Sequence, residues 1–327
     1  MSTLDADLDA PARPVAADGH EVTQAREAVV GSLPVQRLLP LRLRRSVGAW
    51  CFIDHYGPAS VDGVAGMDVP PHPHIGLQTV TWLLAGNVLH ADSLGSEQMI
   101  RPGQLNLMTA GRGIAHAEVS PADHDPLLHG VQLWVALPEH SRQADPAFEH
   151  HADLPTARIG GLAATVLIGS LAGQRSPATA FSPIVGAELA AARDYDGDLP
   201  IDPSFEHVIF VTGGLARAAG TTLAPGSLLY LPAGPDRVPL TAPAGTTLML
   251  LGGVPLGERL LMWWNFVART PREIEDAASA WSEGRFGTVA GYAGEPLAAP
   301  ALDPRLLMRR TAGQSATKEL RGPADLR

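Results

Sequence analysis

The sequence predicts an all-β protein built from two β-barrels, and three observations support that prediction. The chain of 327 residues contains 34 Gly and 29 Pro, which suit many short strands joined by tight turns better than long helices. Short apolar runs recur at regular spacing between turn residues, as in β-sandwiches and barrels. These runs also fall into two similar series, so we expect one type of barrel to be used twice.

The first series begins with an expected strand and hairpin over residues 29–54. It continues through the runs LQTVTWLLAGN, EQMIRPGQLNLMTAGRG, GVQLWVALP and ATVLIGSLAG. The second series follows the polar segment ARDYDGDLPIDP and contains the runs FEHVIFVTGG, TTLAPGSLLYLPAG and TTLMLLGGVPL. Each run is short and is bounded by turn residues, which is typical of a strand.

The spacing of glycines shows the repeat most directly. Gly103 precedes Gly111 by eight residues within GQLNLMTAG, and Gly226 precedes Gly234 by eight residues within GSLLYLPAG. Each segment predicts a strand that ends in a turn of small residues. We therefore expect two copies of one β-barrel that follow one another along the chain.

The expected domain boundaries follow from this division. Residues 1–25 are acidic and rich in Ala and Pro, which predicts a disordered leader. Residues 26–160 are expected to form an N-terminal metal-binding barrel. Residues 161–290 are expected to form a degenerate C-terminal barrel that includes a terminal helix. Residues 291–327 carry Pro, Gly and unpatterned charge, which predicts a loose tail.

The terminal helix has clear start and stop signals. Thr270 and Glu273 form a capping box around Pro271, which occupies the first helical position. Apolar residues then recur at helical spacing, namely Ile274, Ala277, Ala278 and Trp281. Gly284 stops the pattern, so we expect a helix from about Pro271 to Ser282, packed outside the barrels.

Charge and cysteine content exclude several classes of protein. Lys plus Arg is 24 against Asp plus Glu at 34, a net charge of −10, which disfavours direct nucleic-acid binding. The single cysteine, Cys51, excludes an internal disulfide and a cysteine-based metal cluster. The sequence has no apolar run of roughly 18 to 20 residues and no signal-peptide pattern at its start. We therefore expect a cytoplasmic protein that does not enter a membrane.

Two pairs of side chains in the first series have the spacing of metal ligands. His72 and His74 are two residues apart in HPHIGLQT, and so are His116 and Glu118 in GIAHAEVS. Residues at i and i+2 on a strand point to the same face, so two neighbouring strands bring four ligands together. Three imidazoles and one carboxylate suit a divalent ion of iron, nickel, manganese, copper or zinc. Such a ligand set leaves positions open for water, dioxygen or substrate, as in catalytic sites.

The alternative is that these histidines lie on surface loops, since the chain has 12 histidines and a stray HxH pair is unsurprising. The wider pattern favours the metal site. Gly66 lies six residues before His72, giving G-x5-H-x-H, and Gly86 closes the strand that follows. The second pair comes after the glycine-rich turn TAGRG, which completes the two-part cupin pattern.

Longer strings resemble a known family. HPHIGLQTVTWLLAGNVLHADSLGS, IRPGQLNLMTAGRGIAHAEVSP, GVQLWVALP and MWWNFVART are similar to the pirins of the cupin superfamily, and the likeness runs from about residue 35 to 285. The resemblance implies an all-β bicupin, with two barrels of the double-stranded β-helix or jelly-roll type. It also implies Fe(II) held in the N-terminal barrel, with its ligands mapping onto His72, His74, His116 and Glu118. It also implies a quercetin 2,3-dioxygenase activity, in which dioxygen cleaves a flavonol and carbon monoxide is released.

Two roles remain open from the sequence. As an enzyme, the protein would take a small aromatic, flavonol-like substrate and O2, with Glu118 as a metal ligand that also acts as the catalytic base. As a regulator, it would be a non-enzymatic, iron-dependent redox sensor that binds a protein partner through the same ligand set. An apolar pocket over the metal would favour the enzyme, whereas an exposed one-sided patch would favour the regulator.

Some positions depart from the family pattern or have uncertain roles. Gln78 stands where many pirins have Glu, so a proton transfer that uses a carboxylate at this position is not expected here. Ala91 and Leu107 stand where Arg and Trp are frequent, which predicts a pocket of different shape. His90 either lines the pocket mouth or forms a hydrogen bond near the site. The aromatic residues of MWWNF are expected to serve core or inter-barrel packing.

The second series of strands lacks the metal ligands that the first series has. Aligned on Gly214, its HxH positions fall on Pro200 and Asp202 and the following ligand position falls on His207, while Arg237 replaces the last histidine. We therefore expect a structural barrel without a metal.

Overall fold

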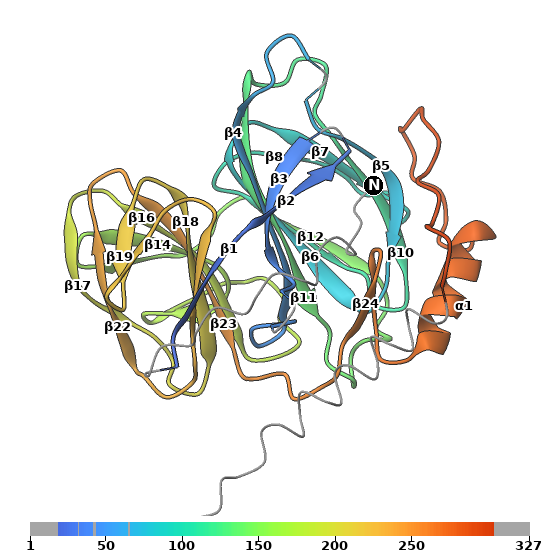
Figure 1. The fold of residues 1–327 in the computed structure, drawn as a ribbon. Helices are drawn as coiled ribbons and strands as arrows, with labels where there is room; N and C mark the ends of the chain where they lie inside the picture. The colour runs from blue at the N-terminus through green and yellow to red at the C-terminus, as the bar shows by residue number, and fades with distance from the viewer. Residues whose placement is uncertain (1–18, 32, 42–43, 65, 304–327) are drawn as a thin grey trace, which may run out of the picture.

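The computed structural model describes residues 19–303, apart from residues 32, 42–43 and 65. Two barrels lie side by side, the first in blue to green and the second in yellow to orange (Figure 1). Within these described residues there is one helix, α1 (Pro271–Ser282), which lies on the outer side of the first barrel. None of the helices among the described residues is long and apolar enough to span a membrane.

The first barrel consists of a seven-stranded sheet, ordered β12-β9-β6-β11-β4-β3-β2, and a four-stranded sheet, ordered β5-β10-β7-β8. Its strands are β2 (Arg26–Val30), β3 (Leu33–Leu39), β4 (Trp50–Ser60), β5 (Asp68–His74), β6 (Leu77–Ala85), β7 (Val88–Asp92), β8 (Glu97–Ile100), β9 (Leu105–Thr109), β10 (Ile114–Val119), β11 (Leu127–Ala136) and β12 (Ala147–His151).

The second barrel repeats this plan. Its large sheet is ordered β1-β21-β18-β23-β16-β14-β13, with β15 paired to β14, and its small sheet is ordered β17-β22-β19-β20. Its strands are β1 (Glu21–Gln24), β13 (Thr156–Ile159), β14 (Leu162–Leu171), β15 (Gln174–Arg175), β16 (Ile184–Ala191), β17 (Tyr195–Pro200), β18 (Glu206–Gly213), β19 (Ala216–Ala218), β20 (Thr221–Leu223), β21 (Ser227–Leu231), β22 (Arg237–Ala242) and β23 (Thr247–Gly253).

The strand order confirms the repeat predicted from glycine spacing. The glycine-bounded segments become β9 and β21, which hold the same place in the two large sheets. Both are five residues long and buried along their whole length. The small sheets also correspond, with β5 and β10 in one matching β17 and β22 in the other. The bicupin architecture is therefore present.

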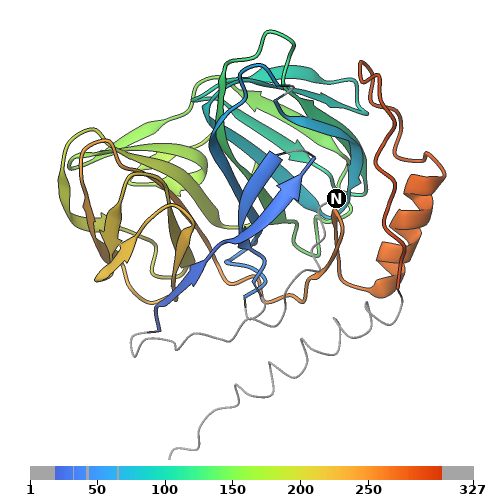
Figure 2. The same ribbon diagram turned by 45° about the horizontal axis from the view of Figure 1, so that its top comes forward.

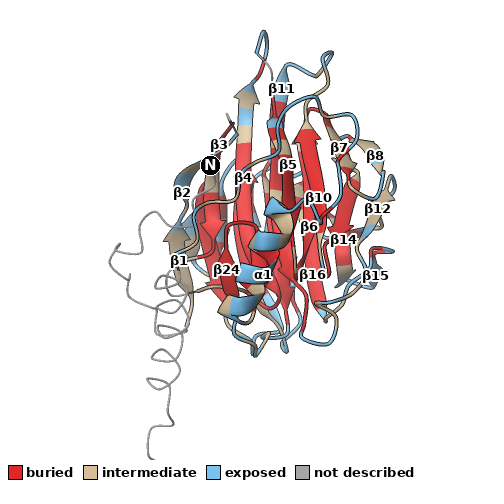
Figure 3. Ribbon diagram, turned by 90° about the vertical axis from the view of Figure 1, so that its right-hand side faces the viewer, coloured by how far each residue is buried: buried red, intermediate tan, exposed pale blue. Residues whose placement is uncertain are grey.

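The two large sheets pack against each other, and their facing side chains form one shared apolar core. Trp82 and Leu107 of the first barrel belong to the same cluster as Phe210 and Leu251 of the second. Trp50 extends across the junction, where its Nε1 donates to the carbonyl oxygens of residues 185 and 252, each at 3.1 Å. Figure 3 shows the buried strands of the first barrel behind α1, whose outer side is exposed.

The chain start differs from the expected leader. Residues 1–18 lie outside the described residues, but Glu21–Gln24 form β1 and pair antiparallel with β21 of the second barrel. Figure 2 shows this blue strand reaching from the first barrel to the second. The pairing covers an edge of the large sheet whose N–H and C=O groups would otherwise lack partners. Glu21 also accepts a hydrogen bond from Arg44 at 3.0 Å.

The C-terminal elements also differ from the expected boundaries, because they pack on the first barrel and not on the second. The hairpin β24 (Leu261–Trp263) and β25 (Phe266–Ala268) and helix α1 share a core with Ala115 and Ala117, on the outer face of β10. The C-terminal elements and the outer face of β10 both present apolar side chains, and the burial of these side chains against one another explains the docking. Thr270 caps α1 by accepting from the backbone N–H of Glu273 at 3.3 Å, as the capping box predicts.

Part of the expected loose tail is docked as well. The backbone N–H of Leu297 donates to the carbonyl of Pro71 at 2.8 Å, and Trp281 Nε1 donates to the carbonyl of Leu297 at 2.8 Å. Tyr292 donates its hydroxyl to Asp68 at 2.8 Å. Residues 304–327 of the expected tail lie outside the described residues.

Candidate metal centre

The two predicted ligand pairs lie on neighbouring strands of the small sheet. β5 and β10 are antiparallel, with His72 directly opposite His116. Residues between the ligands, such as Ala115 and Ala117, belong to the outer core under α1. Because side chains alternate along a strand, His72, His74, His116 and Glu118 point to the opposite face, into the barrel.

Three of these side chains converge closely. The Nε2 atoms of His74 and His116 are 3.1 Å apart, and the ring centroids of His72 and His116 are 4.4 Å apart. One ligand atom from each of the three histidines lies within 4.8 Å of those of the others. All three rings are buried. This triad, His72, His74 and His116, is the centre of the candidate site.

Backbone carbonyls orient two of the three rings. His72 Nδ1 lies 2.8 Å from the carbonyl oxygen of Pro70, and His74 Nδ1 lies 3.0 Å from that of Asn265. A carbonyl only accepts, so each Nδ1 carries the proton and each Nε2 keeps its lone pair for a ligand. Asn265 belongs to the β24–β25 turn, far from β5 in sequence, and the sequence analysis did not find it. Its only signal was the aromatic string MWWNF, which was assigned to packing.

Glu118 lies near His116 and lines the same cavity as His72 and His74. Its carboxylate groups with His116 and His90, and not with the triad as a whole. The hydroxyl of Thr81, on β6, donates to Glu118 Oε1 at 3.0 Å, which leaves Oε2 uncommitted. Burial raises the pKa of Glu118 above its ordinary value. The structure thus brings together the three predicted histidines and places the predicted carboxylate beside one of them.

The electrostatic environment suits metal binding. Burial lowers the pKa of His72 to about 4 and holds the pKa values of His74 and His116 well below the ordinary value of 6.5. The three imidazoles are therefore neutral at pH 7, which is the form that ligates a metal. Buried neutral imidazoles with free Nε2 atoms, next to a carboxylate, fit a divalent transition metal.

A cavity of about 150 Å³ opens onto this site. Its walls are mainly apolar, and Phe52 and Trp134 stack within them with ring centroids 4.0 Å apart. Polar groups also reach it, since Tyr56 and Gln132 line the wall, and the Tyr56 hydroxyl has no hydrogen-bond partner in the structure. The C-terminal segment closes part of the mouth with Leu297, Ala298 and Pro300.

The residues that depart from the family pattern do not line this cavity. Gln78 Nε2 donates to the Thr109 hydroxyl at 3.0 Å and to the carbonyl of Thr179, in the β15–β16 connection of the second barrel, at 3.1 Å. Leu107 belongs to the core shared by the two large sheets. Ala91 packs against the outer core under α1. None of the three lines the cavity.

The second barrel has different residues at the matching positions. In β17 and β22, Leu199 lies opposite Val238, and both belong to the barrel core. Pro200 and Arg237 also pair, but both are exposed on the outer face. The glycine alignment was therefore one residue out of register, because a shift of one residue moves a side chain to the other face. Within the described part of the chain, both groups of potential metal ligands lie in the first barrel.

These features define a class: a double-barrel cupin with a buried three-histidine centre in one barrel. The family models for pirin and for the pirin C-terminal cupin domain match residues 32–135 and 186–287. The chain belongs to the pirin family.

Several relatives are similar over most of their length. A Pseudomonas aeruginosa protein provisionally named quercetin 2,3-dioxygenase is 46% identical over 285 residues, which cover 86% of this chain and 90% of the relative. A pirin-like protein of Caulobacter vibrioides is 36% identical over 272 residues, covering 81% and 93%. The crystal structure of quercetin 2,3-dioxygenase from Acinetobacter baumannii matches with a TM-score of 0.85 at 42% identity, covering 87% of this chain and 96% of that one.

Proposed function

We propose that this protein is a metal-dependent dioxygenase that cleaves a flavonol of the quercetin type with O2 and releases carbon monoxide. The observation that carries the proposal is a group of three buried, neutral imidazoles, two of which, His72 and His74, line a largely apolar cavity. Similarity to proteins named as quercetin 2,3-dioxygenases supports the choice of reaction. Fe(II) is the proposed metal, and nickel, manganese, copper and zinc are the alternatives.

The proposed ligands are His72, His74, His116 and Glu118. When bound, the metal would supply Lewis acidity and redox chemistry for oxidative cleavage of the flavonol ring. The protein would supply binding and orientation. Phe52 and Trp134 offer flat apolar surface for an aromatic substrate, while the Tyr56 hydroxyl and the Gln132 amide offer hydrogen bonds to its hydroxyl groups.

Glu118 is the proposed catalytic base. Because Thr81 already donates to Oε1, the other oxygen, Oε2, is the one that can bind the metal or take the proton of the flavonol 3-hydroxyl. The raised pKa of this buried carboxyl, which is due to desolvation, strengthens it as a proton acceptor. Removal of that proton leaves an anionic substrate, which a divalent metal with three neutral imidazoles attracts.

The enclosed cavity favours the enzyme over a regulator that binds a protein partner. His72 and His74 line the cavity, and each histidine of the triad is at most 7% exposed, so a partner's surface does not reach the ligands. A small planar molecule can reach them through the cavity.

The test is to reconstitute metal-stripped protein with ferrous iron or with zinc, under air. Flavonol loss is followed by absorbance, and carbon monoxide is trapped and measured. We expect turnover with iron and little or none with zinc, which is redox-inert. Absence of carbon monoxide from fully iron-loaded protein would contradict the proposed reaction.

A further inference from the structure

The third histidine of the triad is held differently from the other two. His72 and His74 have backbone carbonyls at Nδ1, but the Nδ1 of His116 faces the Nδ1 of His90 at 3.4 Å. His90 Nε2 in turn lies 3.2 Å from Asp92 Oδ2. His90 and Asp92 are two residues apart on β7, so both reach the same side of the sheet as His116 on the adjacent β10.

The direction of the two hydrogen bonds that join Asp92, His90 and His116 follows from the charge of the Asp92 carboxylate, which can only accept. Asp92 Oδ1 accepts from the backbone N–H groups of Leu94 at 2.9 Å and Ser96 at 3.0 Å, which suits an ionised carboxylate. Because Asp92 accepts from Nε2 of His90, that ring has its proton on Nε2 and a lone pair on Nδ1. The lone pair accepts the Nδ1–H of His116, whose own lone pair then lies on Nε2, facing His74.

Packing fixes the connecting ring. His90 stacks on Phe148 of β12, with ring centroids 4.4 Å apart and planes inclined by 14°. His90 and Asp92 are both buried, so water does not compete for these hydrogen bonds. The connection from carboxylate to ligand is therefore rigid at each step.

We propose that His90 and Asp92 are positioning residues, which set the tautomer of His116 and strengthen its donation to the metal through a carboxylate–imidazole–imidazole chain. The inference rests on the proposed metal site. This chain of hydrogen bonds distinguishes His116 from His72 and His74, whose Nδ1 partners are neutral backbone carbonyls. A stronger donor stabilises the higher oxidation state of iron, so this chain lowers the potential of the bound metal.

Three substitutions separate the parts of the chain. His90→Phe keeps a ring against Phe148 but removes the acceptor for His116. His90→Asn can place its carbonyl oxygen near the lost Nδ1 and so restore that acceptor, without the link to Asp92. Asp92→Asn keeps Oδ1 for the turn but presents an N–H to His90 Nε2, which favours the wrong tautomer of that ring. His150→Phe is the matched control, since His150 also bonds through Nδ1, to Asn106 at 2.7 Å, but lies outside the ligand groups.

The measurements are Co(II) and Fe(II) affinity by chelator competition, the midpoint potential of the bound iron, and the melting temperature of the metal-free protein. His90→Phe and Asp92→Asn are expected to weaken metal binding about 10- to 100-fold. His90→Asn is expected to recover most of that affinity. All three are expected to raise the potential, whereas His150→Phe leaves both quantities unchanged.

Unchanged affinity and potential in both folded His90 variants would overturn the proposal. A wild-type protein that binds two ions, one of which is lost in His90→Phe, would also overturn it, because His90 would then be a ligand itself. A wild-type protein that binds no metal would refute the metal site and the chain together, whereas normal wild-type binding with insensitive variants refutes the chain alone.

Discussion

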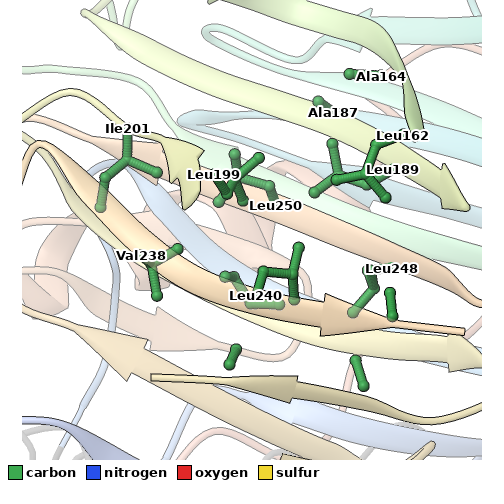
Figure 4. Packing of buried hydrophobic residues seen from close by; sticks show 14 of the residues in the cluster. Leu162, Ala164, Ala187, Leu189, Leu199, Ile201, Val238, Leu240, Leu248 and Leu250 are labelled. Atoms are coloured by element: carbon green, nitrogen blue, oxygen red, sulfur yellow. The ribbon is translucent and has the colours of Figure 1, made fainter. Parts of the chain in front are cut away.

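The two barrels share one strand order but differ in what fills them. In the first, β5 and β10 direct three imidazoles and a carboxylate inward. In the second, the matching strands direct Leu199, Val238 and Leu240 inward, where they meet Leu250 (Figure 4). The backbone therefore specifies two adjacent strands with inward-facing pairs, and the side chains alone decide whether those pairs hold a metal or fill a core.

This difference changes what each barrel needs for stability. Aliphatic side chains fill the second barrel and require no partners beyond contact. The buried polar side chains of the first barrel each require a hydrogen bond, and several of these come from outside the barrel plan. Asn265 of the added hairpin orients His74, and the docked segment around Leu297 closes the cavity. The first barrel thus depends on the C-terminal elements for its site, whereas the second is completed by β1 and by the core that it shares with the first barrel.

Acid is expected to have the largest effect, because it acts on buried histidines in both barrels. Burial holds the pKa of His207 in the second barrel and of His55 in the first at about 4, against an ordinary value near 6.5. Between pH 6.5 and pH 4 these two histidines bind a proton in the unfolded chain but stay neutral in the folded chain. The free energy of unfolding must therefore fall as the pH falls from about 6.5 to 4.

Denaturant titration across this pH range measures the effect. His55→Leu and His207→Leu should each reduce the slope, and exposed His140→Leu should not. A free energy of unfolding that stays level or rises toward pH 4 would contradict the assignment of these histidines as buried and neutral.

A cavity created in the core of the second barrel should lower the free energy of unfolding and leave the metal content unchanged. Leu250→Ala removes a fully buried side chain from the core and is expected to lower the free energy of unfolding by about 2–5 kcal/mol. Urea unfolding gives the free energy, and metal content of the folded variant gives the occupancy. Loss of metal from folded Leu250→Ala would show that the barrels are not independent in function.

Removal of the Glu118 carboxylate in the first barrel should have the opposite pattern of effects, with weaker metal binding and little change in stability. Glu118→Ala is expected to lower metal affinity about 100-fold, roughly 2.7 kcal/mol, while Glu97→Ala, on the exposed start of β8, leaves it unchanged. Chelator competition on both variants makes the comparison. Equal affinities would remove Glu118 from the ligand set.

The smallest expected effect concerns the helix docked on the first barrel. Thr270→Ala removes the N-cap of α1 and should cost about 1 kcal/mol. Ser282→Ala, at the other end of α1, is the control. Thermal unfolding measures both, and equal melting temperatures for the two variants would contradict the cap seen in the structure.

The sequence predicted features that depend on local spacing. The i, i+2 pairs identified His72, His74 and His116 before any fold was known, and the capping box placed the start of α1 at Pro271. The glycine repeat predicted the match between β9 and β21. In each case the information lies within a few residues of the chain.

Features set by tertiary packing were missed. Asn265 reaches His74 from 191 residues away, and no local pattern marks that contact. The glycine alignment chose Pro200 where the structure directs Leu199 inward, because glycine spacing does not fix which face of a strand a residue occupies. The prediction that Leu107 shapes the pocket has the same origin, since the structure places Leu107 in the core shared with the second barrel.

The central claim is that one barrel holds a metal and the other does not, and metal stoichiometry tests it most directly. Stripped protein is loaded with Fe(II) or Co(II) without oxygen, desalted and analysed for metal per chain, as wild type, His116→Ala and His207→Ala. We expect about one ion per chain in wild type and in His207→Ala, and almost none in His116→Ala. Two ions per chain in wild type, or an ion retained in His116→Ala and lost in His207→Ala, would contradict it.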